Sequence, residues 1–314
     1  MSVTFAQGFS AAGVEAGISA TPGKKDVALV VNEGPLTAAA GVFTTNRFCA
    51  APVQWSRKAV ADGSLKAVIL NSGGANACTG KAGYAQSVAT AHEVAGLLGT
   101  EDGEVAVCST GLIGELLPLD KVLDGAARAF AALEPTMAAG EDASHAIMTT
   151  DTKPKTVTRM GSNGFRVGGM VKGSGMIAPQ LATMLCVITT DAVVSAGQLQ
   201  AALGAAVDTS FNRIDVDGCM STNDTVLLLA SGASGIEPDP DEFNDLIANC
   251  CASLARQIIG DGEGASHDIR ITVAGATSED AALAVDVFGQ ISREIGHNCP
   301  PSLMQLAVAR CLEE

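Results

Sequence analysis

One stretch near the middle of the chain restricts the fold most, because a glycine-rich loop there leads directly into an apolar strand. The loop reads Lys172-Gly173-Ser174-Gly175-Met176-Ile177-Ala178-Pro179-Gln180-Leu181-Ala182, and the chain continues as Thr183-Met184-Leu185-Cys186-Val187-Ile188. Glycine permits tight turns with positive φ, and Pro179 stops a helix and favours an extended Ala178. The apolar run that follows is typical of a buried strand. The pattern therefore predicts a cation and a flexible loop before a strand that opens with a small hydroxyl, Thr183.

Thr183 allows two interpretations. A threonine at the start of a buried strand is usually a packed residue whose hydroxyl bonds to the backbone. If the peptide bond between Ala182 and Thr183 breaks, however, the freed α-amine lies beside the hydroxyl and can serve as its base, as in enzymes with an N-terminal threonine nucleophile. Spacing alone favours the packed residue.

Composition limits the class of protein. Apolar residues make up 47% of the 314 residues and aromatic residues only 4%, which predicts a core of small aliphatic side chains in close-packed α/β layers. The net charge of −15, without a basic cluster, argues against nucleic acid or an anionic membrane as a partner. Nine cysteines without a CxxC pair are typical of reduced core thiols, and no secretory signal or membrane-spanning run is seen, so we expect a cytoplasmic protein.

Strand and helix signals alternate along the chain. Strands are predicted at 27–31, 41–44, 66–70, 104–108, 155–160, 165–171, 183–188, 225–229 and 269–273, and helices at 82–98, 119–133, 195–210 and 240–259. The glycine-rich turn after residue 70 lacks the spacing of a phosphate-binding loop, and Asp215 and Asp217 lack that of a calcium loop. We therefore predict stacked β-sheets flanked by helices, with no cofactor and no metal.

Four motifs resemble those of one family. The sequence Lys-Gly-Ser-Gly-Met-Ile-x-Pro-x-x-Ala-Thr-Met-Leu is similar to the self-cleavage segment of the ornithine acetyltransferases, the glutamate N-acetyltransferases (ArgJ type) of arginine biosynthesis. Further similarity lies in Ala75–Gly80, Cys108–Gly114 and Ser221–Thr225, in the same order. The resemblance extends from about residue 8 to about residue 285 and implies a self-processing fold of the N-terminal-nucleophile kind.

The resemblance also implies roles for single residues. Cleavage would occur between Ala182 and Thr183, and Thr183 would be the nucleophile. Thr110 and Gly111 would form an oxyanion hole, although the same residues also fit a simple turn from a strand to the helix at 119–133. The substrate would be bound by Thr149 (with Thr150 as the alternative), Lys172, Thr183 and Glu263, whose carboxylate suits the ammonium of ornithine.

The implied reaction transfers acetyl from N-acetylornithine to glutamate through an acetyl ester on Thr183. Some members of the family also accept acetyl-CoA as donor, and the residues do not decide whether this chain does. Self-cleavage would give an α chain of residues 1–182 and a β chain of residues 183–314, which we expect to assemble as a heterotetramer.

The likeness ends at about residue 285. The family continues with a segment containing Asp-Pro-Asn-Trp-Gly-Arg and a tail that closes the site, whereas this chain reads Val287-Phe288-Gly289-Gln290-Ile291 and ends at Glu314. We therefore expect weakened transfer. Two other functions stay open: a self-processing amidase or aminopeptidase that uses water as acceptor, and an inactive relative.

Overall fold

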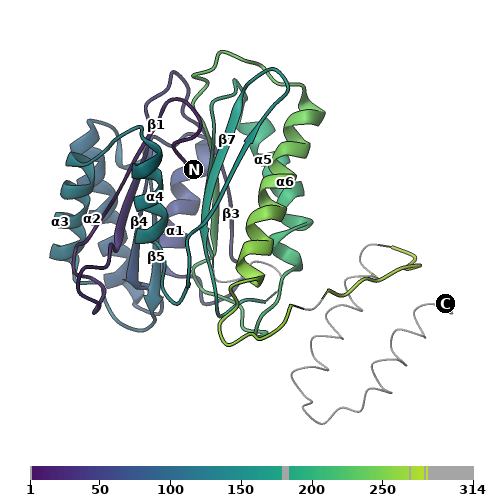
Figure 1. Cartoon of the computed structure of the whole chain (residues 1–314). Helices are drawn as coiled ribbons and strands as arrows, with labels where there is room; N and C mark the ends of the chain where they lie inside the picture. The colour runs from purple at the N-terminus through teal and green to yellow at the C-terminus, as the bar shows by residue number, and fades with distance from the viewer. Residues whose placement is uncertain (1, 179–183, 269, 279–280, 282–314) are drawn as a thin grey trace, which may run out of the picture.

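Two β-sheets stack face to face and helices cover their outer faces (Figure 1). The computed structural model describes residues 2–178, 184–268, 270–278 and 281. The predicted cleavage site, Ala182 and Thr183, lies outside the described residues. The described part of the chain shows the predicted α/β architecture of sheets flanked by helices.

The first sheet has four strands in the order β1-β2-β4-β5. They are β1 (Phe9–Val14), β2 (Val27–Asn32), β4 (Ala67–Gly74) and β5 (Val105–Leu112). Only β4 and β5 run parallel in this sheet, so their carboxyl ends lie side by side. The helices packed with this sheet are α1 (Ala51–Ala59), α2 (Gly80–Leu98), α3 (Leu119–Ala131) and α4 (Met137–Ala146).

The second sheet has five strands in the order β3-β9-β8-β7-β6. They are β3 (Ala38–Phe43), β9 (Thr225–Ala230), β8 (Leu185–Thr190), β7 (Arg166–Lys172) and β6 (Lys155–Met160). Here β8 and β9 are parallel and the other pairs are antiparallel. The helices α5 (Ala196–Asp208) and α6 (Pro240–Ile259) cover the outer face.

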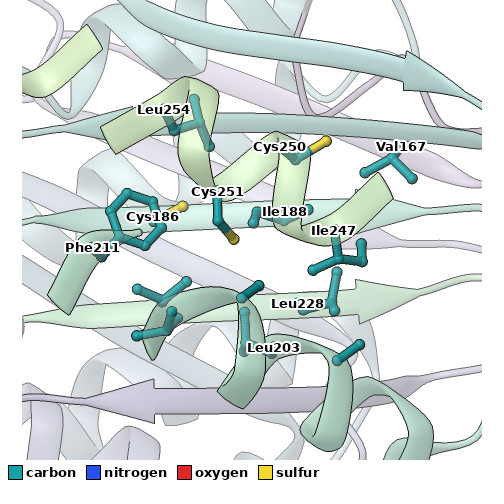
Figure 2. Close-up of a cluster of buried hydrophobic side chains, with 14 of the residues drawn as sticks. Val167, Cys186, Ile188, Leu203, Phe211, Leu228, Ile247, Cys250, Cys251 and Leu254 are labelled. Atoms are coloured by element: carbon teal, nitrogen blue, oxygen red, sulfur yellow. The ribbon is translucent and has the colours of Figure 1, made fainter. Parts of the chain in front are cut away.

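The core forms three apolar layers, one between the sheets and one under each set of outer helices. Between the sheets, Val30, Val68 and Leu70 meet Val187 and Leu229. Figure 2 shows the layer under α6, where Cys250, Cys251 and Leu254 lie over Cys186 and Ile188 of β8. Burial raises the pKa of these thiols, to about 12 for Cys250 and further for Cys251. These cysteines are therefore core thiols, as predicted.

Local signals located most elements correctly, and α6 is the clearest case. Asp239 accepts hydrogen bonds from the backbone N–H groups of Asp241 and Glu242, and Pro240 occupies the first turn, as predicted. Ser195 likewise caps α5.

One prediction of local structure was wrong, and two helices were not predicted. No strand forms over the described residues 270–273, where Ile271 is 44% exposed and no described strand pairs with the segment. Sequence reasoning also missed α1 and α4. Thr136 caps α4 by accepting a hydrogen bond from the Ala139 N–H. The short, alanine-rich sequence of α4 has little amphipathic pattern. Packing rather than local preference stabilises such a helix.

Candidate functional site

Three strands of the second sheet bring the predicted site to one end of that sheet. β7 ends at Lys172, β8 begins at Leu185 and β9 begins at Thr225. Lys172 lies opposite Leu185 in the ladder, and Leu185 lies opposite Thr225. The glycine-rich segment therefore connects two neighbouring strands at this end, where polar residues from several elements meet.

The first sheet contributes the carboxyl end of β5. Lys172 Nζ donates a hydrogen bond to Thr110 Oγ1 across 3.4 Å. Asn223, just before β9, donates from Nδ2 to the carbonyl oxygens of Ser109 at 2.8 Å and Ala75 at 2.6 Å. The buried Asn223 amide thus ties the two sheets together beside Thr110 and Lys172.

Thr110 and Gly111 do not form the strand-to-helix turn that was the alternative interpretation, because β5 continues to Leu112. Gly111 has a φ of +130°, and a Cβ there would lie 2.5 Å from the carbonyl carbon of Gly73. Only glycine tolerates both conditions. The strand end therefore combines a buried hydroxyl with an exposed glycine, and a hydroxyl with a nearby backbone N–H is a suitable donor pair for an oxyanion.

Lys172 is a buried cation with a perturbed pKa. Its side chain is 2% exposed, and burial lowers its pKa. The nearby carboxyls of Asp151 and Asp224 oppose this effect, whereas the ammonium groups of Lys155 and Lys24 add to it. Because a neutral amine is less costly to bury than an ammonium, Lys172 releases its proton more readily than an exposed lysine.

A second buried lysine lies next to this group. Lys155 Nζ donates to Asp151 Oδ1 at 2.6 Å and to Asp261 Oδ2 at 2.5 Å. Asp151 also accepts from the N–H groups of Gly173 at 2.7 Å and Thr149 at 3.0 Å. Each charge is therefore paired and hydrogen-bonded, which is the condition under which buried charges are tolerated.

The pairing lowers the pKa of both acids. Burial by itself would raise the pKa of Asp151, but the ammonium groups of Lys172 and Lys155 and the Gly173 N–H hold it below its ordinary value. Burial acts in the same direction on Asp261, and hydrogen bonds from Lys155 and Thr152 lower its pKa. We refer to Lys155, Asp151 and Asp261 as the lysine–carboxylate network.

Asp224 is a buried carboxyl in a different situation. Its Oδ1 accepts a hydrogen bond from the Met184 N–H at 3.0 Å, whereas no described residue donates to Oδ2. Burial raises the pKa of Asp224 well above the ordinary carboxyl value, against smaller opposing effects of the Met184 N–H, the Ser221 and Thr44 hydroxyls and Lys172. This carboxyl therefore holds its proton more tightly than an ordinary aspartic acid.

Thr149 lies in an open pocket next to the network. The pocket has a volume of about 560 Å³ and is lined by Thr21, Gly23, Lys24, Lys25, Asp142, His145, Met148, Thr149 and Asp151. Thr150, the alternative to Thr149, is exposed. The structure therefore brings the predicted residues Thr149 and Lys172 to the same carboxylate oxygen, Asp151 Oδ2, to which the Thr149 N–H donates and from which Lys172 Nζ lies 3.9 Å away.

Glu263 lies beside the glycine-rich loop. Its N–H donates to the carbonyl of Ser174 at 2.8 Å, and a Cβ at Gly175 would lie 2.6 Å from Glu263 Oε2. Asp217 holds the same loop from another direction, accepting from the N–H groups of Met176 at 2.6 Å and Ile177 at 2.9 Å. The exposed carboxylate of Glu263 is thus placed next to the loop by contacts that only glycine at 175 allows.

Sequence reasoning assigned no role to Lys155, Asp151, Asp261 or Asp224, although all four lie at the site. Polar residues between helices and strands are usually solvated, and all three of these aspartates lie in such connecting segments. Asp261 is 106 residues from Lys155, and no local signal joins them.

Comparisons with known proteins identify the family of this chain. The chain matches the model of the ArgJ family over residues 10–290. The arginine biosynthesis bifunctional protein ArgJ of Bifidobacterium longum is 82% identical over 284 residues, which cover 90% of this chain and 73% of that protein. The ArgJ protein of Streptomyces coelicolor is 54% identical over 300 residues, covering 95% and 75%.

Solved structures show the same fold. The ornithine acetyltransferase of Mycobacterium tuberculosis, in complex with ornithine, has a TM-score of 0.56 and 52% identity, covering 59% of this chain and 96% of that one. An aminopeptidase of Ochrobactrum anthropi, a variant of the Ntn hydrolase fold, has a TM-score of 0.51 at 12% identity, covering 93% and 94%, and shows likeness of fold alone. The predicted fold class is confirmed. None of the helices in the described part of the chain has the length and apolarity needed to cross a membrane.

Proposed function

The chain belongs to the ArgJ family, and from this premise we propose that Thr183 carries acetyl from N-acetylornithine to glutamate. Membership confirms the predicted enzyme class, an amino-acid acetyltransferase of arginine biosynthesis. The related enzyme with bound ornithine supports this donor, because ornithine is the product that N-acetylornithine leaves behind.

The contact between Lys172 and Thr110 carries the proposal. These residues come from different sheets, yet Nζ and Oγ1 lie 3.4 Å apart at the sheet end where β8 begins. Thr183 is covalently joined to Met184, one residue before that strand. A nucleophile that precedes β8 therefore belongs to the same group of strand ends as the buried Thr110 hydroxyl, Gly111 and Lys172, whose pKa is lowered.

The chemistry follows from these groups. In the processed enzyme, the α-amine of Thr183, with an ordinary pKa of about 7.7, takes the hydroxyl proton. A neighbouring Lys172 ammonium favours the neutral amine by charge repulsion. Oγ attacks the acetyl carbonyl, Thr110 Oγ1 and the Gly111 N–H stabilise the oxyanion, and the proton passes to departing ornithine. The amine of glutamate then attacks the acetyl ester and frees the hydroxyl.

We assign substrate binding to the residues around this centre. Glu263 would pair with the ammonium of ornithine, and Thr149 and Lys172 would bind the substrate carboxylate. No step in this scheme uses a cofactor or a metal. The same carbonyl chemistry allows acetyl-CoA as a second donor, which the assay below tests directly.

Cleavage before Thr183 would leave the two chains associated. β7 lies in residues 1–182 and pairs with β8 in residues 183–314 over six register positions, and β3 pairs in the same way with β9. Cutting the loop between β7 and β8 breaks none of these pairings. We propose that the α chain (1–182) and β chain (183–314) stay together and assemble as a heterotetramer in the cytoplasm.

Mass spectrometry of the purified protein tests this proposal. We expect two chains, 1–182 and 183–314, and a single 31.6 kDa chain for Thr183→Ala. The wild-type protein is then given N-acetylornithine or acetyl-CoA, with and without glutamate, and N-acetylglutamate and free acetate are measured. A wild-type protein that remains one chain in fresh and aged samples would refute the nucleophile, and release of acetyl only to water would indicate an amidase.

A further inference from the structure

We propose that Lys24 binds the side-chain carboxylate of the acceptor glutamate and so selects this acceptor over amino acids that lack a second carboxylate. The inference rests on the proposed function, since it concerns how the acceptor of that reaction is bound. It assigns a role to the open pocket beside Thr149, whose lysines no step of the proposed mechanism uses.

The two substrates differ in charge at the end of the side chain. N-acetylornithine carries one carboxylate and a side-chain ammonium, for which Glu263 is the proposed partner. Glutamate carries a carboxylate at each end, and a carboxylate placed against Glu263 meets a like charge, which disfavours binding. The acceptor therefore needs a second cation besides Lys172, the proposed partner of its first carboxylate.

Two other lysines act on Lys172 at this end of the sheets. Burial is the main cause of the lowered pKa of Lys172, and the ammonium groups of Lys155 and Lys24 add to it. The Lys155 side chain is 0% exposed, and its Nζ already donates to Asp151 and Asp261. Lys24 is only partly buried, and it takes part in none of the ion pairs between described residues. Its ammonium is therefore free to pair with a ligand.

The pocket itself separates Lys24 from its neighbour. Lys24 and Lys25 are adjacent in the sequence and line the same pocket, but Lys25 Nζ forms an ion pair with Asp142, another lining residue. His145, the third basic residue of the lining, is exposed. The volume of about 560 Å³ lies within the range of small-molecule sites, about 300–1,000 Å³. The pocket thus offers a small anion an unpaired lysine beside a paired one.

Backbone hydrogen bonds fix the turn that carries Lys24 to the strand ends of the site. The carbonyl of Asp26, two residues further on, accepts the Ser72 N–H at 2.9 Å. Ser72 lies opposite Thr110 in the ladder between β4 and β5. The buried Asp26 carboxylate also accepts two backbone N–H groups of the loop between β1 and β2, at 2.6 and 2.8 Å. Lys24 therefore extends from a fixed backbone position at the same end of the first sheet as the predicted oxyanion hole.

The inner wall of the pocket leads to the group that would bind the first carboxylate. Thr149 and Asp151 both line the pocket, and Lys172 Nζ lies 3.9 Å from Asp151 Oδ2. The Asp151 carboxylate is buried and has Lys155 as its partner at 2.6 Å, so its charge is balanced and does not cancel the attraction of Lys24 for an anion. A ligand with a carboxylate at each end thus has a partner at each end of this pocket.

Lys24→Met tests the proposal, because methionine keeps an unbranched apolar stem and removes the charge. In acetyl transfer from N-acetylornithine, we expect the KM for glutamate to rise roughly 10–100-fold. Lys24→Arg keeps a cation and should recover most of the affinity. Lys25→Met is the matched control, because this neighbouring lysine of the same pocket is paired with Asp142, and its KM for glutamate should stay within about threefold of wild type.

A binding measurement provides a readout that does not depend on turnover. In a chemical-shift titration of the ¹⁵N-labelled full chain, wild type should bind glutamate roughly 10–100-fold more tightly than glutamine, whose side chain is uncharged. Lys24→Met should bind the two amino acids with similar affinity. This result in a chain that transfers no acetyl would support the inference and refute the proposed function.

Three outcomes overturn the inference. The first is a Lys24→Met protein with wild-type affinity for glutamate and normal transfer, which leaves the proposed function intact; a loss in His145→Gln then assigns the carboxylate to His145. The second is an equal loss of ornithine release from N-acetylornithine when glutamate is absent, because Lys24 would then serve the donor step. The third is a wild-type chain that does not distinguish glutamate from glutamine.

Discussion

Two buried carboxyls at the same end of the sheets are bonded in opposite ways. Asp151 accepts hydrogen bonds from Lys155, Gly173 and Thr149, and its pKa is lowered. Asp224 has one backbone donor and one oxygen without a described partner, and its pKa is raised. Burial is the largest influence on the pKa of both, so the partners decide the direction.

The difference indicates how each carboxyl contributes to the stability of the fold. A buried charge with every lone pair occupied keeps its ionisation state and holds its neighbours in place. A buried carboxyl without a paired cation costs stability when it is ionised. Variants at the two positions should therefore differ in their effect on stability.

The largest change in stability is expected from Lys155→Met. Removal of the ammonium leaves Asp151 and Asp261 buried without their common partner, and breaking a buried pair on one side costs about 3–5 kcal/mol. Urea unfolding of this variant in the single-chain Thr183→Ala background gives the free energy of unfolding. Lys58→Met, on the exposed face of α1, is the control and should change it by less than about 0.5 kcal/mol. A loss below about 1 kcal/mol at Lys155 would show that the network does not stabilise the fold.

Thr110→Ala should affect activity rather than stability. If Thr110 donates to the oxyanion, its loss slows acetyl transfer by roughly 10²–10³-fold, while the melting temperature stays close to that of the wild type. Thr110→Ser keeps the hydroxyl and should recover most of the rate. An activity loss that merely follows a fall in the folded fraction would make Thr110 a packing residue.

The pH dependence of stability should differ between the two carboxyls. The folded-state pKa of Asp151 is lowered, so its contribution is fully present above the unfolded value of about 3.9 and disappears as the pH falls through the lower folded value. Melting temperatures between pH 7 and pH 3 should fall at the acid end in the wild type. Asp151→Asn should already be less stable at pH 7 and should show a shallower acid loss. Parallel curves for the two proteins would contradict this assignment.

The smallest effect on stability is expected from Asp224→Asn. The folded-state pKa of Asp224 is raised, so the wild type loses stability as the pH rises from the unfolded carboxyl value toward the folded one. The amide removes this loss and keeps an acceptor for the Met184 N–H. At pH 8 the variant should match the wild type within about 1 kcal/mol or exceed it, as measured by urea unfolding in the Thr183→Ala background. A loss as large as that of Lys155→Met would make the two carboxyls equivalent.

Local patterns predicted the elements whose ends carry their own signals. Asp239 and Pro240 marked the start of α6, and the apolar run after Met184 marked β8. The segment at 270–273 had an apolar, β-forming pattern but no described partner strand, so local preference alone did not produce a strand there. A strand needs a neighbour to satisfy its backbone groups, and the sequence of the strand does not say whether the neighbour exists.

By itself, the sequence determined the layered α/β class, the family and the residues of the glycine-rich loop, because these depend on spacing along the chain. Only the tertiary structure decided that Lys172 meets Thr110 across the two sheets and that Lys155 meets Asp261 from 106 residues away. It also decided that two lysines and backbone N–H groups surround Asp151, whereas burial dominates at Asp224. The physical reason is that burial and hydrogen-bond partners set the state of a carboxyl, and both arise only when distant strand ends meet.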